Sequence, residues 1–305
     1  MKKEIENSEH IKKIFSAKFI EEWKKMIQSL YHYSSAADFL VVPSLAFSKT
    51  YSYLPLLNYT DVYSEDTDAL INSLPKGSHY LIRALNPNYR EFQMDETVTM
   101  RLDLKNRSEN KIWDNSFDTK LRNQIRKAQK SVLTCSIGNS SKLGDDFYFL
   151  YSKTMHKYGT PPFSKRLFEM IAHSFKMTYV VVYDKPQPVC GLILLFDQDI
   201  AHVPWAGALD AYRKYSHNNL MYWEAIKFSL SVNCKVFDFG RSGYGTNTFQ
   251  FKKQWGAVPI KIDLISDRNQ NVYSKYTLAS KVWKCIPPSI TNSLGPVLCR
   301  YLVDL

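Results

Sequence analysis

Apolar and polar positions repeat with a helical or a strand period through the second half of the chain, so the order of its predicted elements is clear. The segment 144–159 has apolar residues at helical spacing, acidic residues near its start and a glycine at its end, as an amphipathic helix does. The runs 178–184 and 189–197 are short and apolar and flank the turn sequence KPQP, which is typical of a β-hairpin. The same reasoning predicts helices over 163–175 and 220–231 and strands over 131–138, 200–208, 235–240 and 258–266.

The loop that opens at Gly240 holds three of the chain's eleven glycines, the others being Gly243 and Gly245. A P-loop requires a lysine at the position of Thr246, so this is not the loop of an ordinary nucleotide hydrolase. In a nucleophile elbow the second glycine would stand one position after Gly243, so Ser242 is not expected to be a hydrolase nucleophile. The Rossmann pattern is also absent, and the role of the loop must come from its context.

A short helix is predicted directly after this loop. Thr246 or Thr248 is suited to cap its first turn, because a threonine hydroxyl accepts a hydrogen bond from a backbone N–H of that turn. Phe251 and Trp255 stand four residues apart and therefore share a face, and Gly256 is suited to end the helix.

The first 115 residues follow a looser version of the same order, with a strand, a helix and two strands predicted over 52–60, 65–74, 79–85 and 97–104. The segment 118–132 between the halves has one apolar stripe and an otherwise basic surface, as an amphipathic helix does. A chain of 305 residues is long enough for two domains of about 150 residues each. We predict an N-terminal lobe over 1–130, a C-terminal lobe with the main site over 131–268, and a tail over 269–305 that packs on the first lobe.

The charge balance indicates the kind of partner. Lys and Arg number 40 against 29 Asp and Glu, which gives a formal charge of +11 and a pI of about 9.2. A charge of this size predicts attraction to nucleic acid, to nucleotide-linked substrates or to an anionic membrane, and does not choose among them. The hydrophobic content of 45% is that of a globular protein with a large core.

Several classes of protein are disfavoured. No apolar run is long enough for a transmembrane helix, and the opening MKKEIENSEH has no apolar core of a signal peptide, so a cytoplasmic location is expected. The five cysteines are widely spaced and never form C-x-x-C, which indicates neither a disulfide framework nor a zinc site. The seven histidines form no H-E-x-x-H pattern, and no metal is expected.

Four segments together resemble the FemAB-like aminoacyltransferases, in particular the branch associated with exopolysaccharide and exosortase gene clusters. They are LRNQIRKAQKS at 121–131, HKYGTPPFSKRLF at 156–168, the W-A-G-A-x-x-x-Y-x-x-Y-x-x-N-N-L-x-Y-W-E-A-I pattern at 205–226 and F-D-F-G-R-S-x-x-G-T-x-x-F-x-F-K-x-x-W-G-A at 237–257. The resemblance implies a mixed α/β, tandem GNAT-like fold of two lobes, with which the predicted element order of the second half agrees.

The resemblance also implies an activity. Fem enzymes transfer an amino acid from aminoacyl-tRNA to an amine of a peptidoglycan precursor, and the exopolysaccharide branch has no settled substrate. In a GNAT-like domain the acyl donor lies where two parallel strands separate, here 200–208 and 235–240. Asp238 and Arg241 would emerge at that opening, and glycines there would let backbone N–H groups approach an anion. Lys252 matches a lysine that the family has near substrate phosphates, where it can neutralise charge.

From these positions we predict Asp238, Lys252 and Arg241 as catalytic residues, with Asp238 orienting or deprotonating the acceptor amine. Each candidate also has a structural interpretation: Asp238 can form an ion pair with a neighbouring Arg or Lys, His202 is typical of a buried core histidine, and the basic face of 118–132 is typical of a solvated helix. The predicted substrate-binding residues are Tyr158, His202, Trp205, Asn219, Tyr222, Ser242, Gly243, Arg122 and Arg126.

The donor stays open between aminoacyl-tRNA and acyl-CoA, and no tightly bound cofactor is expected. Enzymes of the GNAT fold that use acetyl-CoA carry [QR]-x-x-G-x-[GA] before the helix that holds the pyrophosphate. The corresponding sequence here is 213-RKYSHNNL-220, where Ser216 and Asn218 occupy the glycine positions. This departure favours aminoacyl-tRNA, and Arg213 and Asn218 are the candidate donor-binding residues.

We therefore predict a transferase that moves an acyl or aminoacyl group onto an amine of a cell-envelope precursor, either a peptidoglycan peptide or an exopolysaccharide amino sugar, lipid- or nucleotide-linked. One alternative is an acyl-CoA-dependent N-acetyltransferase acting on an amino sugar, and another is a non-catalytic module that binds glycan or nucleic acid. The tail contains Lys275, Lys281, Lys284 and Arg300 among apolar residues, so it is expected to pack on the first lobe or to rest on an anionic membrane at its inner face. The sequence does not give the oligomeric state.

Overall fold

The computed structural model describes residues 9–43, 49–267 and 272–302; the expectations that rest on the first eight and last three residues lie outside this part. Unit 1, the first of two compact units, comprises Met1–Lys13, Tyr89–Tyr151 and Phe175–Lys261, and unit 2 comprises Ile14–Asn88, Ser152–Ser174 and Ile262–Leu305. The sequence predicts consecutive lobes, whereas these units interleave. The reason is strand pairing, which joins residues 97–103 to residues 236–243.

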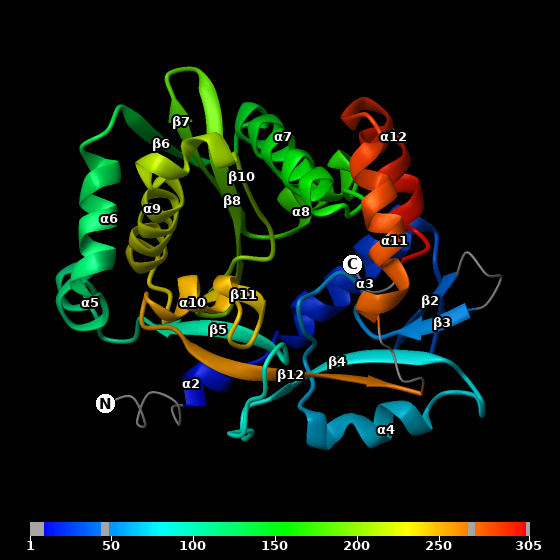
Figure 1. Cartoon of the computed structure of the whole chain (residues 1–305). Helices are drawn as coiled ribbons and strands as arrows, with labels where there is room; N and C mark the ends of the chain where they lie inside the picture. The colour runs from blue at the N-terminus through cyan, green and yellow to red at the C-terminus, as the bar shows by residue number, and fades with distance from the viewer. Residues whose placement is uncertain (1–8, 44–48, 268–271, 303–305) are drawn as a thin grey trace. The chain divides into compact units, whose positions relative to one another are not determined.

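A mixed sheet forms the centre of unit 1 (Figure 1). Its strands are β5 (Thr97–Asp103), β6 (Leu133–Gly138), β7 (Met177–Asp184), β8 (Gln187–Asp197), β9 (Ile200–His202), β10 (Ala206–Ala208), β11 (Val236–Gly243) and the first part of β12 (Val258–Ser266). They follow the order β12-β5-β11-β9-β8-β7-β6, with β10 also pairing with β8. Among these strands the pairing of β9 with β11 is parallel and the others are antiparallel.

The parallel pair β9–β11 separates partway along its length. Ile200 to His202 lie opposite Val236 to Asp238, and the Val203 N–H donates to the Asp238 carbonyl 2.8 Å away. After this bond the chain leaves β11 and returns as β10 to pair with β8, while β11 continues beside β5 alone. The strand predicted at 200–208 is thus two strands, in agreement with Pro204, which has no N–H to donate to a ladder.

Helices cover both faces of strands β7 and β8 (Figure 1). On one face lies α9 (His217–Ser231), against which α6 (Thr119–Gln129) packs. On the other face lies the first part of α7 (Ser141–Tyr158), whose Leu150 backbone approaches Gly207 so closely that a Cβ there would lie 2.5 Å away. The predicted helix at 220–231 begins three residues earlier than expected, at His217. Before it, the predicted polar loop contains the short 3-10 helix η2 (Asp210–Tyr215).

Aromatic side chains fill the core of unit 1 beneath β11. Trp255 is fully buried, and its ring contacts Phe117, Phe239 and Tyr222 at centroid distances between 5.2 and 6.2 Å. Trp255 follows α10 (Asn247–Lys253), which Thr246 caps by accepting a hydrogen bond from the Phe249 N–H. Gly256 then takes a left-handed conformation with φ 83°, so the predicted cap and the predicted end of this helix are both confirmed.

Unit 2 contains the strands β1 (Ser34–Ala36), β2 (Phe39–Pro43), β3 (Lys49–Ser52) and β4 (Tyr80–Asn86), which neighbour one another in that order. The predicted strand at 52–60 is wrong beyond its first residue. Residues 53–60 form turns and bends, and Leu54 and Leu56 have φ of 54° and 71°, which no strand accommodates. The predicted helix at 65–74 is found as η1 (Ser64–Asp66) and α4 (Thr67–Asn72).

The remaining helices of unit 2 are α3 (Ala17–Tyr31), α8 (Lys165–Ser174), α11 (Val272–Cys285) and α12 (Pro288–Cys299). The tail packs on the N-terminal part of the chain, since the Tyr33 hydroxyl donates to the Arg300 carbonyl over 2.6 Å. No helix in the described part of the chain has the length and apolar character needed to cross a bilayer.

Candidate functional site in the opening between two strands

Asp238 ends the parallel stretch of β11, and its carboxylate is buried and fully bonded. Oδ1 accepts hydrogen bonds from the Thr99 hydroxyl at 2.5 Å and the Gly240 N–H at 2.8 Å. Oδ2 accepts one from Arg101 Nε at 2.9 Å. Both side chains of this ion pair are almost completely buried, with exposures of 1% for Asp238 and 0% for Arg101.

These partners decide the charge of Asp238. Burial by itself would raise the pKa of the carboxyl group, but Arg101, His202 and the two further hydrogen bonds outweigh it and lower the pKa below its ordinary value. A general base requires a raised pKa and an oxygen that is available to the substrate. The geometry therefore favours the structural interpretation of Asp238, as the anion that holds β5 and the start of the glycine loop together.

Lys252 has its ammonium group inside the same region. It extends from α10 and donates to the carbonyls of Gly240 and Arg241 at 2.9 and 2.7 Å. Burial lowers the pKa of Lys252 to about 7, an effect that Asp238 opposes and Arg241 reinforces. A neutral lysine keeps two N–H bonds, which matches the two carbonyl acceptors. Lys252 thus ties α10 to the chain just beyond Asp238, at the point where β11 shifts its register with β5.

His202 lies at the end of β9, on the other side of the same opening. Its Nδ1 is 3.8 Å from Asp238 Oδ2, and its side chain is 5% exposed. Burial lowers the pKa of His202 to about 4, so the ring is neutral at physiological pH. The structure thus brings the predicted residues Asp238, Lys252 and His202 together.

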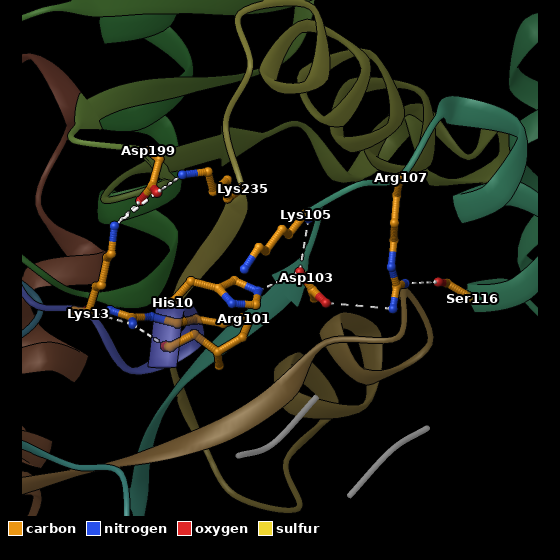
Figure 2. A network of polar contacts seen from close by, with 10 residues as sticks. His10, Lys13, Arg101, Asp103, Lys105, Arg107, Ser116, Asp199 and Lys235 are labelled. Atoms are coloured by element: carbon orange, nitrogen blue, oxygen red, sulfur yellow. Dashed lines mark hydrogen bonds and ion pairs between the residues drawn. The ribbon is translucent and has the colours of Figure 1, made fainter. Parts of the chain in front are cut away.

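Arg101 links this cluster to the start of the described chain. While its Nε pairs with Asp238, its Nη1 donates to the carbonyls of Ile11 and Lys13, the latter at 2.8 Å. Two contacts hold the same N-terminal segment (Figure 2): His10 forms a hydrogen bond of 2.7 Å with Asp103, and Lys13 forms an ion pair of 2.9 Å with Asp199. The short helix α2 (Glu9–Lys12) therefore packs against the guanidinium group of Arg101.

Close packing is found at two of the three glycines, Gly243 at the end of β11 and Gly245 in the turn that follows it. A Cβ on Gly245, whose φ is 80°, would lie 2.3 Å from the Met94 sulfur. A Cβ on Gly243 would lie 2.9 Å from Thr246 and 3.4 Å from Asp95. Residues 94–95 thus cover this part of the chain, and both glycines allow this close approach. Their predicted role in approaching an anion stays a prediction.

The other residues predicted around the opening fall into two groups. Arg241 and Trp205 are partly exposed, on β11 and between β9 and β10. Tyr222 and Ser242 are buried: the ring of Tyr222 packs against Phe239 at 5.3 Å, and the hydroxyl of Ser242 donates to the Arg241 carbonyl. The first group can therefore meet a ligand, and the second supports the backbone.

An open depression of about 570 Å³ lies between α6 and the start of α9. It is lined by Thr119, Lys120, Asn123, Gln124, Lys127 and Ser216. Ser216 precedes the first residue of α9 in a left-handed conformation with φ 55°, and its side chain makes no capping hydrogen bond. The positive end of a 15-residue helix and two exposed lysines therefore face this depression.

The predicted donor-binding and basic residues lie around this depression without lining it. Arg213 is exposed and pairs with Asp210 at 2.7 Å, and the side-chain oxygen of Asn218 is buried with no hydrogen bond to the described residues. Asn219 donates to Gln124 at 3.3 Å, which joins α9 to α6. The guanidinium of Arg126 stacks over Trp113 at 5.3 Å, and Arg122 is partly exposed.

Tyr158 belongs to a different part of the molecule from the other predicted site residues. It ends α7 within unit 2 and is 58% exposed, with Lys157 Nζ 5.2 Å from its ring centre. Its exposure fits the prediction that the turn presents it outward, and its role as a substrate-binding residue stays a prediction.

Sequence reasoning missed several residues that the structure brings into these two places. Arg101 and Thr99 are hidden in a strand whose pattern indicates only a core. A buried Asp requires a partner, but nothing in the sequence says that the partner stands 137 residues earlier. Lys120 and Lys127 were visible as part of the basic face of 118–132, and only the position of α9 distinguishes them from its other bases.

Comparison with known proteins supports the fold. Residues 115–253 match the model of the acetyltransferase (GNAT) domain. The crystal structure of FemX is similar with a TM-score of 0.54 and 14% identity, over 79% of this chain and 86% of that one. The C-terminal domain of a putative lysylphosphatidylglycerol synthetase from Agrobacterium fabrum gives 0.51 and 10%, over 90% and 96%.

The structure of L-PGS from Bacillus licheniformis is also similar, with a TM-score of 0.50 and 8% identity over 89% of this chain and 98% of that one. No curated protein sequence matches the chain. The mixed α/β, GNAT-like fold predicted from the sequence is confirmed by these similarities.

Proposed function

We propose that the chain is an N-acyltransferase that moves an acyl or aminoacyl group onto an amine of a cell-envelope precursor. The observation that carries this proposal is the separation of β9 from β11 after His202 and Asp238, inside the segment that matches the GNAT domain. An opening between parallel strands exposes backbone groups that no neighbouring strand uses. A thioester or aminoacyl ester carbonyl can be held there by main-chain hydrogen bonds.

The reaction we propose is direct attack of the acceptor amine on the donor carbonyl. A C–N bond forms, the bond from the carbonyl carbon to the ester oxygen or thioester sulfur breaks, and the amine proton passes to the leaving group or to water. The oxyanion that develops is stabilised by backbone N–H groups beyond the opening and by Arg241, which is partly exposed at this position.

Asp238, Arg101 and Lys252 contribute indirectly, because they hold the backbone around Gly240 and Arg241 in place. Asp238 fixes the Gly240 N–H, and Lys252 fixes the carbonyls of Gly240 and Arg241. A site that stabilises charge needs donors that are already oriented before the reaction, because reorganisation during the reaction would cost free energy. The buried cluster supplies this rigidity.

The depression between α6 and α9 supports a donor with a phosphate-rich moiety. Lys120 and Lys127 line the depression and can contact phosphate groups. The partial positive charge at the first turn of α9 also attracts an anion. Because the glycines of the acetyl-CoA pattern are absent, we favour an aminoacyl ester of tRNA over a CoA thioester.

Calorimetry at one fixed salt concentration tests the donor, with charged tRNA, uncharged tRNA and acetyl-CoA as the three probes. We expect the tightest binding for charged tRNA, and weaker binding to a Lys120→Glu/Lys127→Glu variant, with a salt slope reduced by about one for each lysine. The matched control is Lys111→Glu/Lys130→Glu, which changes two exposed bases outside the depression.

The other outcomes are equally informative. Tight binding of acetyl-CoA alone would establish the alternative, an acyl-CoA-dependent N-acetyltransferase. Equal binding of charged and uncharged tRNA, with no transfer to any amine, would favour a non-catalytic nucleic-acid-binding protein. If neither variant pair changes the binding of any probe, the depression is not the donor site.

A further inference from the structure

The helix α12 presents an apolar stripe to solvent. Ile290, Leu294 and Val297 stand at positions i, i+4 and i+7 and are 47%, 47% and 59% exposed. Val282 on α11 is 55% exposed. Of the nine large apolar side chains with high exposure in the described chain, these two helices therefore carry four. Such clustering marks an interaction surface, whereas single exposed apolar residues are ordinary.

The opposite face of α12 is firmly packed, so the stripe is an outward face of a fixed helix. Gly295 meets Pro162 so closely that a Cβ would lie 2.4 Å from the proline ring. The Cys299 thiol contacts the carbonyls of Pro161 and Pro162 at 3.5 and 3.3 Å, and Thr291 is fully buried. These inward positions repeat every four residues, which leaves the stripe on the other side.

The charged residues of the segment 272–302 have one sign. Residues 272–302 contain no Asp or Glu, and their bases are Lys275, Lys281, Lys284 and Arg300. Lys281 and Lys284 are exposed on α11, on either side of Val282 and the buried Trp283. The helix α12 itself carries no charged side chain. An apolar stripe on an uncharged helix that follows a helix with exposed lysines has the composition of an element that lies in the interface of an anionic bilayer.

We propose that α11 and α12 dock the protein on an anionic lipid surface, with Ile290, Leu294 and Val297 entering the headgroup region and Lys281 and Lys284 contacting lipid phosphates. A second copy of the chain is a poorer occupant, because two such faces would bring lysines together without any acidic partner. The proposal concerns unit 2 and is independent of the acyl-transfer site, which lies in unit 1. If the proposed function holds, docking on the lipid surface would bring the protein within reach of lipid-linked acceptors.

Flotation of the full chain with vesicles tests this surface. Vesicles of phosphatidylcholine alone are compared with vesicles that also contain phosphatidylglycerol, at low and high salt. We expect binding only to the anionic vesicles, and a decrease at high salt. An Ile290→Ser/Leu294→Ser/Val297→Ser variant is expected to lose this binding, and Lys281→Glu/Lys284→Glu to weaken it by at least about five-fold for each lysine.

Two controls separate docking from general changes of charge or apolar surface. Met94→Ser/Val132→Ser removes two exposed apolar side chains of unit 1, and Lys18→Glu/Lys76→Glu changes two exposed lysines of unit 2 outside the surface. Both are expected to bind vesicles like the unaltered chain. Light scattering and thermal unfolding establish that every variant keeps its mass and fold.

Failure of the unaltered chain to float with anionic vesicles would overturn the proposal, and so would equal flotation of the serine variant. A serine variant that changes from dimer to monomer while keeping its vesicle binding would assign the stripe to a second copy. None of these outcomes affects donor binding, so failure here and failure of the acyl-transfer proposal are distinguishable.

Discussion

Two clusters of charge in unit 1 differ in almost every physical respect. Around Asp238, charged and polar groups are buried and saturated by partners, and their hydrogen bonds hold β5, β11 and α10 together. In the depression between α6 and α9, the lysines are exposed and face a broad open volume. Burial decides what a charge does: a buried charge stabilises one geometry, whereas an exposed charge is available to a partner.

The strongest way to test this contrast is to remove the cation from the buried pair. Arg101→Leu would leave the Asp238 carboxylate buried without its counter-ion, so we expect a loss of about 3–5 kcal/mol in the free energy of unfolding. Urea denaturation monitored by fluorescence measures this loss.

The control for this experiment removes the anion as well. Arg101→Leu/Asp238→Leu takes both charges out of the core and should recover part of the lost stability, because no unpaired charge remains. A loss below about 1 kcal/mol in the single variant would mean that the pair does not organise the site.

The next largest effect is expected at Lys252. Lys252→Met leaves the carbonyls of Gly240 and Arg241 without their donor, which should cost about 1–3 kcal/mol at pH 9, where the lysine is a neutral amine. The sequence predicts a catalytic role for Lys252. Because the side chain is also buried and bonded to two consecutive backbone carbonyls, its replacement is expected to lower stability as well.

The pH dependence of the same variant sharpens the test. In the folded protein the pKa of Lys252 is about 7, below its ordinary value of 10.5, so between these values the unfolded chain binds more protons. The stability that Lys252 contributes should therefore rise with pH through this window, by up to about 1.4 kcal/mol per pH unit, and fall as pH returns to 7. A difference between the two proteins that stays constant from pH 7 to 9.5 would contradict the buried, titrating lysine.

The smallest effect on stability is expected in the open depression. Lys120→Ala and Lys127→Ala change exposed side chains for which no buried partner is found in the described chain, so each should alter the free energy of unfolding by less than about 0.5 kcal/mol. Thermal unfolding measures this directly. A loss as large as that of Arg101→Leu would remove the distinction between the two clusters.

Local patterns predicted the elements of unit 1 well, and those of unit 2 less well. The strand at 258–266 and the cap at Thr246 are found as predicted, because both depend on neighbouring residues. The strand at 52–60 fails since Leu54 and Leu56 adopt left-handed conformations that no local pattern of apolar residues reveals. The helix α3 was missed although Phe19, Trp23 and Met26 stand at helical spacing.

The candidate site was predicted in its chain position but only partly in its roles. Asp238, Lys252 and His202 do lie together at the opening between β9 and β11. Their roles depend on partners from elsewhere in the chain, above all Arg101, and on a degree of burial that sequence does not give. The lysines of the depression were predicted only as part of a basic helix, since the segment 118–132 has five bases and only two of them line the depression.

The sequence by itself determined the order of elements in the second half of the chain, the caps of its short helix and the net positive charge, because these depend on nearest neighbours and on composition. Only the tertiary structure decided which aspartate pairs with which arginine, where the parallel strands separate, and which face of α12 remains exposed. The physical reason is the same in each case. The effect of a charge or an apolar side chain is set by what surrounds it, and those surroundings come from distant parts of the chain.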